Sequence, residues 1–307
     1  MKNAIMYYYQ FIPASLRQKE KDYFFSIGRK NYLLTLYKRS PEEADNLYKL
    51  SETLKNYNTP YSKIILNKDK NMISIINNHP YVLLENSSYL PPFNIEEIIN
   101  QEIVLPNYSL FPKLFRTGWK TLWEAKIDYF EYQITTFGKK YQLLSESIPY
   151  YIGLAENAIS YFDAVQATSK DYRDVLVLCH KRLNTDDALA FYNPLNLVID
   201  HKSREIGEYL KEVFIKDTYD ISSINKLISS IQLSNYGFGL LMARLLFPCF
   251  YFDQYERIIN ENQDEKNINQ FIIRVEEYER YLYDIYNLIR KRAEIPPLDW
   301  LNRIFKA

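Results

Sequence analysis

The sequence predicts an α+β protein with two lobes, a small β-rich lobe followed by a large, mainly helical one. Residues 1–86 alternate short β-rich runs with polar turns around one helical pattern, an order that fits a helix over an antiparallel sheet. Residues 116–307 carry long amphipathic helical patterns instead. The paired prolines of "SSYLPPF" (87–93) predict a stiff connector, which we place at residues 87–115.

The β-rich lobe begins with two expected strands, "DYFFSI" (22–27) and "NYLLTLY" (31–37), joined by a tight turn at Gly28. Segment 41–57 opens with Pro and two acidic residues and then repeats apolar residues at helical spacing, which predicts a helix. The apolar positions of that helix are Ala44, Leu47, Leu50 and Leu54. Residues 61–86 complete the sheet as short β-rich segments separated by Asn, Asp and Lys turns.

The helical lobe contains three clear amphipathic helices, at 116–135, 148–165 and 268–293. Pro149 is expected near the start of the second, and the prolines of "IPPLDWL" end the third. The expected buried stripes are Trp119, Leu122, Trp123, Ile127, Phe130 and Ile134, then Ile152, Ala155, Ile159 and Phe162, and finally Ile268, Phe271, Val275, Tyr278, Leu282, Ile285 and Ile289. The tryptophans, Trp300 included, are expected to pack rather than to bind a ligand.

Two short β-like runs interrupt the helical lobe, within "DVLVLCHKRLNTDD" (174–187) and "PLNLVIDHKSREIGEYL" (194–210). We expect a hairpin of functional loops over 174–210. Neighbouring residues on a strand point to opposite faces, so Cys179 and His180 are not expected to form a catalytic pair, and Cys179 is expected to be buried.

The composition excludes several classes of function. Lys+Arg and Asp+Glu are both 38, so the chain lacks the basic surplus of a nucleic-acid binder. The best apolar stretch, 238–252, is broken by Arg244 and Pro248, so we predict no transmembrane helix. Two cysteines in a chain of this length favour synthesis in a reducing compartment. The chain has 7 glycines and no glycine-rich phosphate motif.

This layout resembles that of protein-kinase-like phosphotransferases, which implies a bilobal fold with an antiparallel β N-lobe and a helical C-lobe. The loop "HKRLNTDD" (180–187), followed by "LVID" (197–200), resembles the aminoglycoside-phosphotransferase pattern H-G-D-x-H-x-x-N with a strand that ends in I-D. More specifically, "YYIGLAENAISYF", "LCHKRL", "IDHKSREIGEYLK" and "ARLLFPCFYFDQYE" resemble, in this order, the YutH group of spore coat proteins. That group belongs with the CotS-like kinases of endospore-forming bacilli.

The resemblance implies roles for four residues of this region. His180 matches the loop histidine, which props the loop, and Arg182 stands where the catalytic Asp belongs. Asp187 stands where a metal-binding Asn belongs and Asp200 matches a metal-binding Asp, so both could ligate Mg²⁺. The plainer alternatives are a solvated loop for Asp187 and local backbone capping for Asp200. Arg182 is expected to bind a phosphate or carboxylate partner, or to form an ion pair with Asp187 or Asp200.

The departures from the pattern predict a pseudokinase. A positioned base contributes about 10²–10⁴-fold to a rate, and an arginine cannot accept a proton. Thr35 or a neighbour occupies the expected position of the phosphate-pairing Lys, while Lys38 lies at the strand end, out of register. We therefore expect no cofactor. ATP and Mg²⁺ belong only to two alternatives: an active phosphotransferase with a rearranged site at Asp187 and Asp200, or a nucleotide- or metabolite-binding sensor.

The segment after "LVID" is expected to form a helix that is fixed to the loop. Arg204 and Glu208 are expected to anchor that helix to the loop, and Glu205 to point to solvent. The resemblance implies synthesis in the mother-cell cytoplasm followed by location in the spore coat. It also implies other coat proteins as partners and a role as an assembly or binding module.

Overall fold

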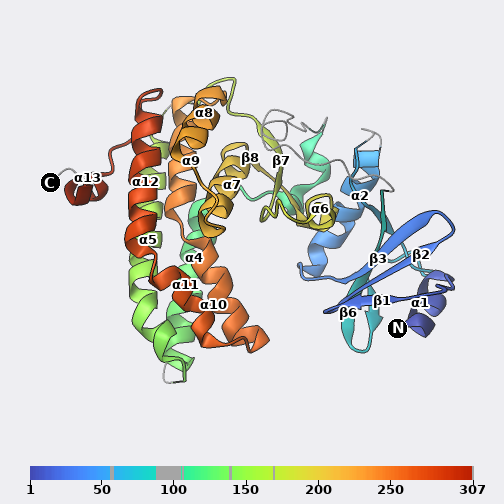
Figure 1. Ribbon diagram of the computed structural model, residues 1–307. Helices are drawn as coiled ribbons and strands as arrows, with labels where there is room; N and C mark the ends of the chain where they lie inside the picture. The colour runs from blue at the N-terminus through green and yellow to red at the C-terminus, as the bar shows by residue number, and fades with distance from the viewer. Residues whose placement is uncertain (56–58, 88–104, 106, 138–139, 169, 306–307) are drawn as a thin grey trace. The chain divides into compact units, whose positions relative to one another are not determined.

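A computed structural model describes residues 1–55, 59–87, 105, 107–137, 140–168 and 170–305. The chain divides into two compact units (Figure 1). The β unit takes residues 1–98, 103–115 and 178–199, and the helical unit takes residues 99–102, 116–177 and 200–307. Most of the predicted connector, at 88–104 and 106, lies outside the described residues.

An antiparallel sheet, six-stranded over the described residues, organises the β unit. Its strands are β1 (Arg17–Lys19), β2 (Asp22–Ile27), β3 (Lys30–Leu36), β4 (Lys63–Ile65), β5 (Ser74–Ile76) and β6 (His79–Asn86). Their order is β1-β2-β3-β6-β4, with β5 also paired to β6. The predicted hairpin of β2 and β3 is confirmed, and Gly28 turns it at φ +59°, which costs glycine no steric strain.

Helices pack against this sheet through its alternating residues. On one face, Phe25, Tyr32 and Leu34 form a buried cluster with Ile5 and Tyr9 of α1 (Lys2–Tyr9). The predicted helix at 41–57 is confirmed as the 3₁₀-helix η1 (Pro41–Glu43) and α2 (Ala44–Lys55), which contacts β4. The buried leucines of α2 are Leu47, Leu50 and Leu54, as the periodicity predicts. Two further 3₁₀ turns, η2 (Tyr108–Leu110) and η3 (Pro112–Leu114), belong to the same unit.

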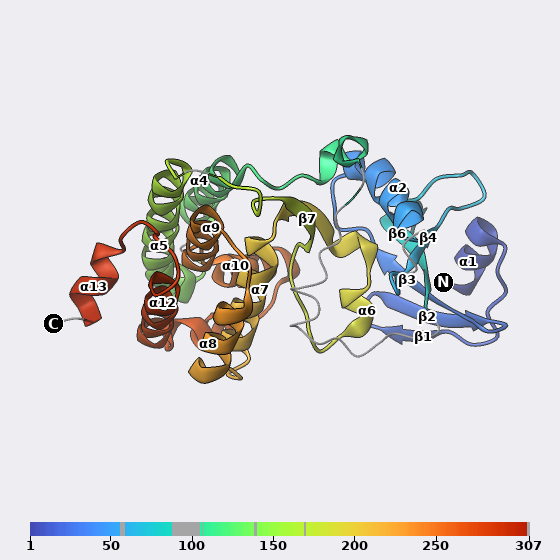
Figure 2. The same ribbon diagram turned by 90° about the horizontal axis from the view of Figure 1, so that it is seen from above.

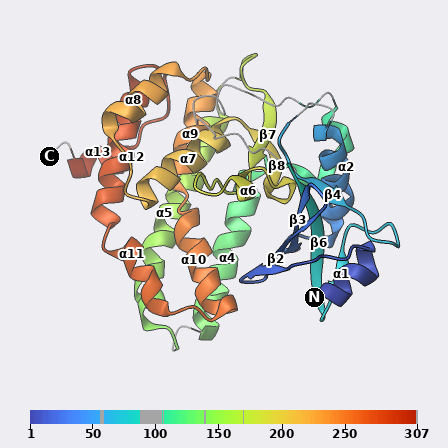
Figure 3. The ribbon, with the colours of Figure 1, turned by 45° about the vertical axis from the view of Figure 1, so that its right-hand side comes forward.

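The helical unit is a bundle, seen nearly end-on in Figure 2. Its elements are α4 (Trp119–Phe137), α5 (Gln142–Gln166), α7 (Ser203–Ile215), α8 (Ile221–Ser230), α9 (Asn235–Leu246), α10 (Cys249–Glu261), η5 (Glu265–Ile268), α11 (Asn269–Ile272), α12 (Val275–Arg290) and α13 (Asp299–Phe305). Helix α9 packs against both α5 and α7 (Figure 3). Over the parts of the chain that are described, no helix combines the length and apolar character needed to span a bilayer.

The three predicted amphipathic helices exist, but the buried stripe of each needs correction. In α4, Leu122 is 48% exposed, although Trp119, Trp123, Ile127 and Phe130 are buried. Helix α5 begins at Gln142, so Pro149 lies inside it rather than near its start. Its buried side is rotated from the predicted one: Ile152 and Ile159 are only half-buried, because Tyr151, Leu154, Ala155, Ala158, Phe162 and Val165 face the core. The third pattern splits into η5, α11 and α12. Ile268, Tyr278, Leu282, Ile285 and Ile289 are buried as predicted, whereas Phe271 and Val275 are only half-buried.

Candidate functional site

The predicted functional loops lie between two short strands that pair with each other, β7 (Leu176–His180) and β8 (Leu197–His201). The intervening residues form α6 (Ala188–Phe191) and the 3₁₀-helix η4 (Pro194–Asn196). The Lys181 N–H donates to the Asn196 carbonyl oxygen at 2.6 Å, which closes the base of this loop. The strand pair and Cys179, which is fully buried, are as predicted.

His180 lies in the interior and packs against α6. Its Nε2 is 2.9 Å from the carbonyl oxygen of Phe191, and the two ring centroids are 4.2 Å apart. Because a carbonyl oxygen only accepts, Nε2 carries the proton and donates it. This contact joins the end of β7 to the last turn of α6, which is the geometry of a residue that props the loop.

Asp187 and Arg182 both bond to local backbone. Asp187 is the N-cap of α6, and its Oδ1 accepts the N–H groups of Leu189 at 3.0 Å and Ala190 at 3.1 Å. Arg182 donates from Nη1 to the Lys181 carbonyl oxygen at 2.8 Å. Arg182 thus places a permanent cation at the position that the family pattern reserves for the base.

Asp200 is completely buried, and three donors surround its carboxylate. The Trp119 indole Nε1 lies 3.1 Å from Oδ1 and 2.9 Å from Oδ2. Arg204 donates from Nη1 to Oδ2 at 2.6 Å, and the His201 N–H donates to Oδ1 at 2.8 Å. The guanidinium that neutralises Asp200 therefore comes from Arg204, four residues along the chain.

These contacts make Asp200 a poor ligand for Mg²⁺. A divalent cation would have to displace the indole and the guanidinium from the carboxylate, and separation of this buried ion pair is costly. Among the residues that the structure describes, no group of three or more His, Cys, Asp or Glu side chains is arranged to hold a metal. The residues present do not fit the metal that the kinase pattern implies.

In the described part of the β unit, Thr35 occupies the position expected for the phosphate-pairing lysine. On β3, the Thr35 hydroxyl donates to Oδ1 of Asp22 on β2 at 2.7 Å. Burial raises the pKa of the Asp22 carboxyl, and the nearby negative charges of Glu20 and Asp187 raise it further, whereas Lys38 opposes them. Lys38 follows the end of β3 and is exposed. A polyphosphate would meet carboxylates here, where a kinase offers a lysine and glycine N–H groups.

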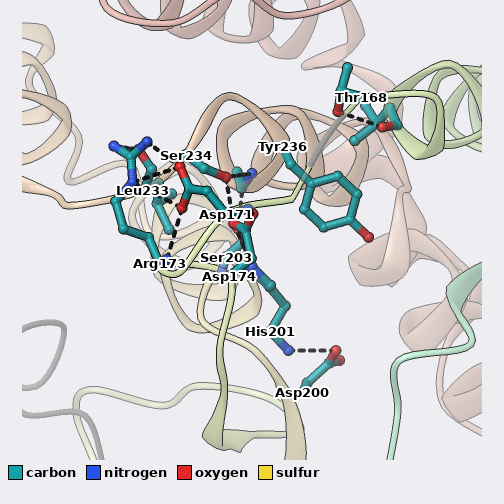
Figure 4. Close-up of polar contacts among 12 residues, drawn as sticks. Thr168, Asp171, Arg173, Asp174, Asp200, His201, Ser203, Leu233, Ser234 and Tyr236 are labelled. Atoms are coloured by element: carbon teal, nitrogen blue, oxygen red, sulfur yellow. Dashed lines mark hydrogen bonds and ion pairs between the residues drawn. The ribbon is translucent and has the colours of Figure 1, made fainter.

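His201 belongs to a second buried network, shown in Figure 4. The Ser203 N–H donates to His201 Nδ1 at 3.1 Å, so the ring proton is on Nε2. The Ser203 hydroxyl lies 2.9 Å from the same Nδ1 and donates to the Gly237 carbonyl oxygen at 2.6 Å. Because Ser203 is fully buried and its hydroxyl proton goes to a carbonyl, this His–Ser contact does not form a nucleophile and base.

Asp174 faces the other side of the His201 ring. Its Oδ1 is 3.5 Å from Nε2, and its carboxylate accepts the Asp171 N–H at 2.7 Å and the Ser234 hydroxyl. Burial holds the pKa of His201 below its usual 6.5, although Asp174 and Asp200 both favour the charged ring. His201 is therefore neutral at neutral pH, and the network ties β8 to the loop before β7 and to the start of α9.

The first turns of α7 fix the end of β8, but not entirely as predicted. Arg204 anchors the helix through Asp200, as expected. Glu208 instead pairs with Arg244 of α9, whose Nε and Nη2 lie 2.9 and 2.5 Å from Oε1. Glu205 was expected in solvent, but it is buried, because α7 is covered on nearly all sides. No local spacing in the sequence indicates the Trp119 contact, whereas the i, i+4 spacing of Asp200 and Arg204 is compatible with their ion pair.

The chain matches a known protein family and a characterised relative. The family model described as "Spore coat putative kinase YutH" matches residues 2–285. The endospore coat-associated protein YutH of Bacillus subtilis (strain 168) is 28% identical, and the alignment covers 86% of each chain.

Solved structures of low sequence identity share the fold. An aminoglycoside phosphotransferase from Alicyclobacillus acidocaldarius superposes with a TM-score of 0.58 at 10% identity, over 91% of this chain and 93% of the other. Amicoumacin kinase does so with a TM-score of 0.53 at 10% identity, over 96% and 93%. The predicted α+β, protein-kinase-like fold is confirmed, and the chain belongs to the YutH family of spore coat kinase-like proteins.

Proposed function

We propose that this protein is a catalytically inactive kinase-fold protein of the bacterial spore coat, where it acts as an assembly or binding module. The observation that carries the inactive state is the carboxylate of Asp200, which is buried and bonded by Trp119 and Arg204. In an active kinase the matching Asp must be available to Mg²⁺.

The β unit and the loop after β7 support the same proposal. Arg182 cannot serve as a general base, and Thr35 bonds to a carboxylate where a lysine would meet phosphate. Positioning and charge neutralisation of the phosphates supply most of the acceleration in phosphoryl transfer, so their joint loss leaves little catalytic power.

The coat location rests on the family and on the relative from Bacillus subtilis, whose name describes a coat-associated protein. We propose synthesis in the mother-cell cytoplasm, followed by incorporation into the coat through contacts with other coat proteins. The proposal requires neither ATP nor Mg²⁺.

Titration with ATP and Mg²⁺ tests the inactive state. The melting temperature should not change with ATP up to about 5 mM in the presence of excess Mg²⁺, because Thr35 stands where a lysine would meet phosphate and the Asp200 carboxylate is bonded by Trp119 and Arg204. An active phosphotransferase that uses Asp187 and Asp200 would instead release ADP. A nucleotide sensor would show a shift without turnover.

Two variants sharpen the measurement. A Mg²⁺-dependent shift that disappears in Asp200→Asn, but persists in Asp186→Asn on the exposed loop, would overturn the inactive assignment. ATP turnover on a coat protein or a small substrate would overturn it as well.

A further inference from the structure

A cavity of about 240 Å³ lies within the helical unit, at the side of Asp200. Residues of α4, α5, α9, β8 and the loop before β7 line it, all from the same unit. Pockets that bury drug-sized ligands are about 300–1,000 Å³, so this one suits a molecule of roughly ten non-hydrogen atoms.

Three aromatic rings form the apolar walls of this cavity. Trp119 and Phe162 lie with ring centroids 5.8 Å apart, and Tyr236 closes another side. The Tyr236 hydroxyl accepts the Gln166 amide at 3.0 Å, which fixes the ring. These walls are preformed and apolar, so a ligand with an aliphatic or aromatic body gains by leaving water.

Among the described residues that line the cavity, two side chains of opposite charge remain once the ion pair of Asp200 is set aside. Arg204 neutralises Asp200, and burial keeps His201 neutral. The remaining charges are those of Asp174, whose side chain is 1% exposed, and Lys170, which is exposed and has its Nζ 4.9 Å from the Tyr236 ring centroid. A carboxylate offers about four acceptor positions, so Asp174 can accept another donor beside Asp171 and Ser234.

We propose that this cavity binds a small zwitterion of the α-amino acid class. Its ammonium group donates to Asp174, its carboxylate pairs with Lys170, and its apolar side chain lies against Trp119, Phe162 and Tyr236. A simple anion would meet the carboxylates of Asp174 and Asp200, and a simple cation would meet the ammonium group of Lys170. All of the described residues that line the cavity belong to the helical unit. Asp200 lines the cavity and also carries the proposed inactive state, but amino-acid binding requires neither ATP nor Mg²⁺, so the titrations below test it separately.

Calorimetric titration with three probes of one skeleton tests the charge requirement. L-Leucine should bind, whereas L-leucinamide, which lacks the carboxylate, and N-acetyl-L-leucine, which lacks the ammonium group, should each bind about tenfold more weakly or worse, because each loses a charged hydrogen bond. Equal or tighter binding of either analogue would contradict the requirement for a zwitterion. The absence of a heat signal with leucine up to about 20 mM would contradict the binding site itself.

Variants place the binding in this cavity. Lys170→Met and Asp174→Asn should each weaken leucine about tenfold or more, whereas Lys226→Met, on the exposed side of α8, should leave it unchanged. Lys170 is exposed, so its variant is expected to fold even if Asp174→Asn does not. Unchanged affinity in Lys170→Met overturns the proposal.

Discussion

Asp200 shows how a residue of a catalytic pattern becomes part of a core. Its carboxylate has no solvent contact and is bonded by an indole N–H, a guanidinium and a backbone N–H. Such a buried ion pair adds little net stability over an apolar replacement, but removal of one partner costs about 3–5 kcal/mol. The contribution of each of these residues, Asp200, Arg204 and Trp119, to the stability of the fold therefore depends on the presence of the other two.

At the same scale, burial of His201 is expected to make the stability of the protein depend on pH. The His201 ring is held neutral by burial, with Lys170 adding to the effect and Asp174 and Asp200 opposing it. In the unfolded chain this histidine takes up a proton near pH 6.5, before the folded protein does. The free energy of unfolding should therefore fall as pH drops from 7.5 to 5.5, by at most about 1.4 kcal/mol per pH unit for this one group.

Chemical denaturation at several pH values measures this slope. His201→Gln should flatten it, whereas His79→Gln, at an exposed position of β6, should leave it as in the parent protein. An unchanged slope in His201→Gln would assign the acid sensitivity to other groups.

The sequence indicated candidate site residues but not their contacts. The order of motifs identified His180, Arg182, Asp187 and Asp200, because each occupies a fixed place in a family pattern. The Trp119 bond to Asp200 spans 81 residues of chain, and nothing in local spacing encodes such a contact. Glu205 was misplaced for a similar reason: its burial depends on which other helices cover α7.

At the scale of elements, the close packing of α9 against α5 depends on the absence of a side chain at Gly239. A Cβ added at Gly239 would lie 2.8 Å from Cγ2 and 2.9 Å from Cγ1 of Val165 on α5. Both atoms belong to a buried, β-branched side chain that cannot turn away without loss of packing. Gly239 thus sets the distance between α5 and α9.

Gly239→Ala should lower the free energy of unfolding by about 1–3 kcal/mol, because overpacking outweighs the gain in helix propensity. Gly153→Ala is the matched control inside α5. A Cβ there meets nothing within 4 Å, so this variant should raise the free energy of unfolding by up to about 1 kcal/mol. Urea unfolding followed by circular dichroism compares the two, and equal effects would contradict this account.

Elements with a regular apolar period were predicted well, and those without one were not. Helix α2 and most of the buried stripe of α12 follow their periodicity. Helix α1 was not predicted, because its tyrosines lie on both sides: Tyr7 is exposed and Tyr9 is buried. The stripe of α5 was rotated because small residues such as Ala158, rather than Ile159, are buried.

At the scale of the whole molecule, the proposed assembly role has a direct consequence. Spores that lack the protein should carry a coat of altered composition, because its coat partners lose an attachment surface. Comparison of coat extracts from mutant and parent spores by quantitative mass spectrometry measures this. A strain that produces the Asp186→Asn variant is the control and should match the parent, whereas an unchanged coat in the null strain contradicts the assembly role.

The fold class could be predicted from the order of the hydrophobic patterns along the chain. A β-rich first part and a helical second part can be recognised without information on tertiary contacts. The division into units did not follow as simply. Residues 178–199 lie late in the chain, yet they belong to the β unit. Arg39, just after β3, donates to the carbonyl oxygens of Leu195 and Leu197, at 3.0 and 2.6 Å, and sequence spacing does not reveal such tertiary bonds.

The bonds to Asp200 also bear on evolution. Under the proposed inactive state, a substitution that placed an Asp at position 182 would supply a base, but the carboxylate at 200 would still be engaged by Trp119 and Arg204. Release of that carboxylate would cost about 3–5 kcal/mol, a large share of the roughly 5–15 kcal/mol that stabilises a domain. On this proposal, a gain of catalysis would require a variant that is first less stable and still inactive.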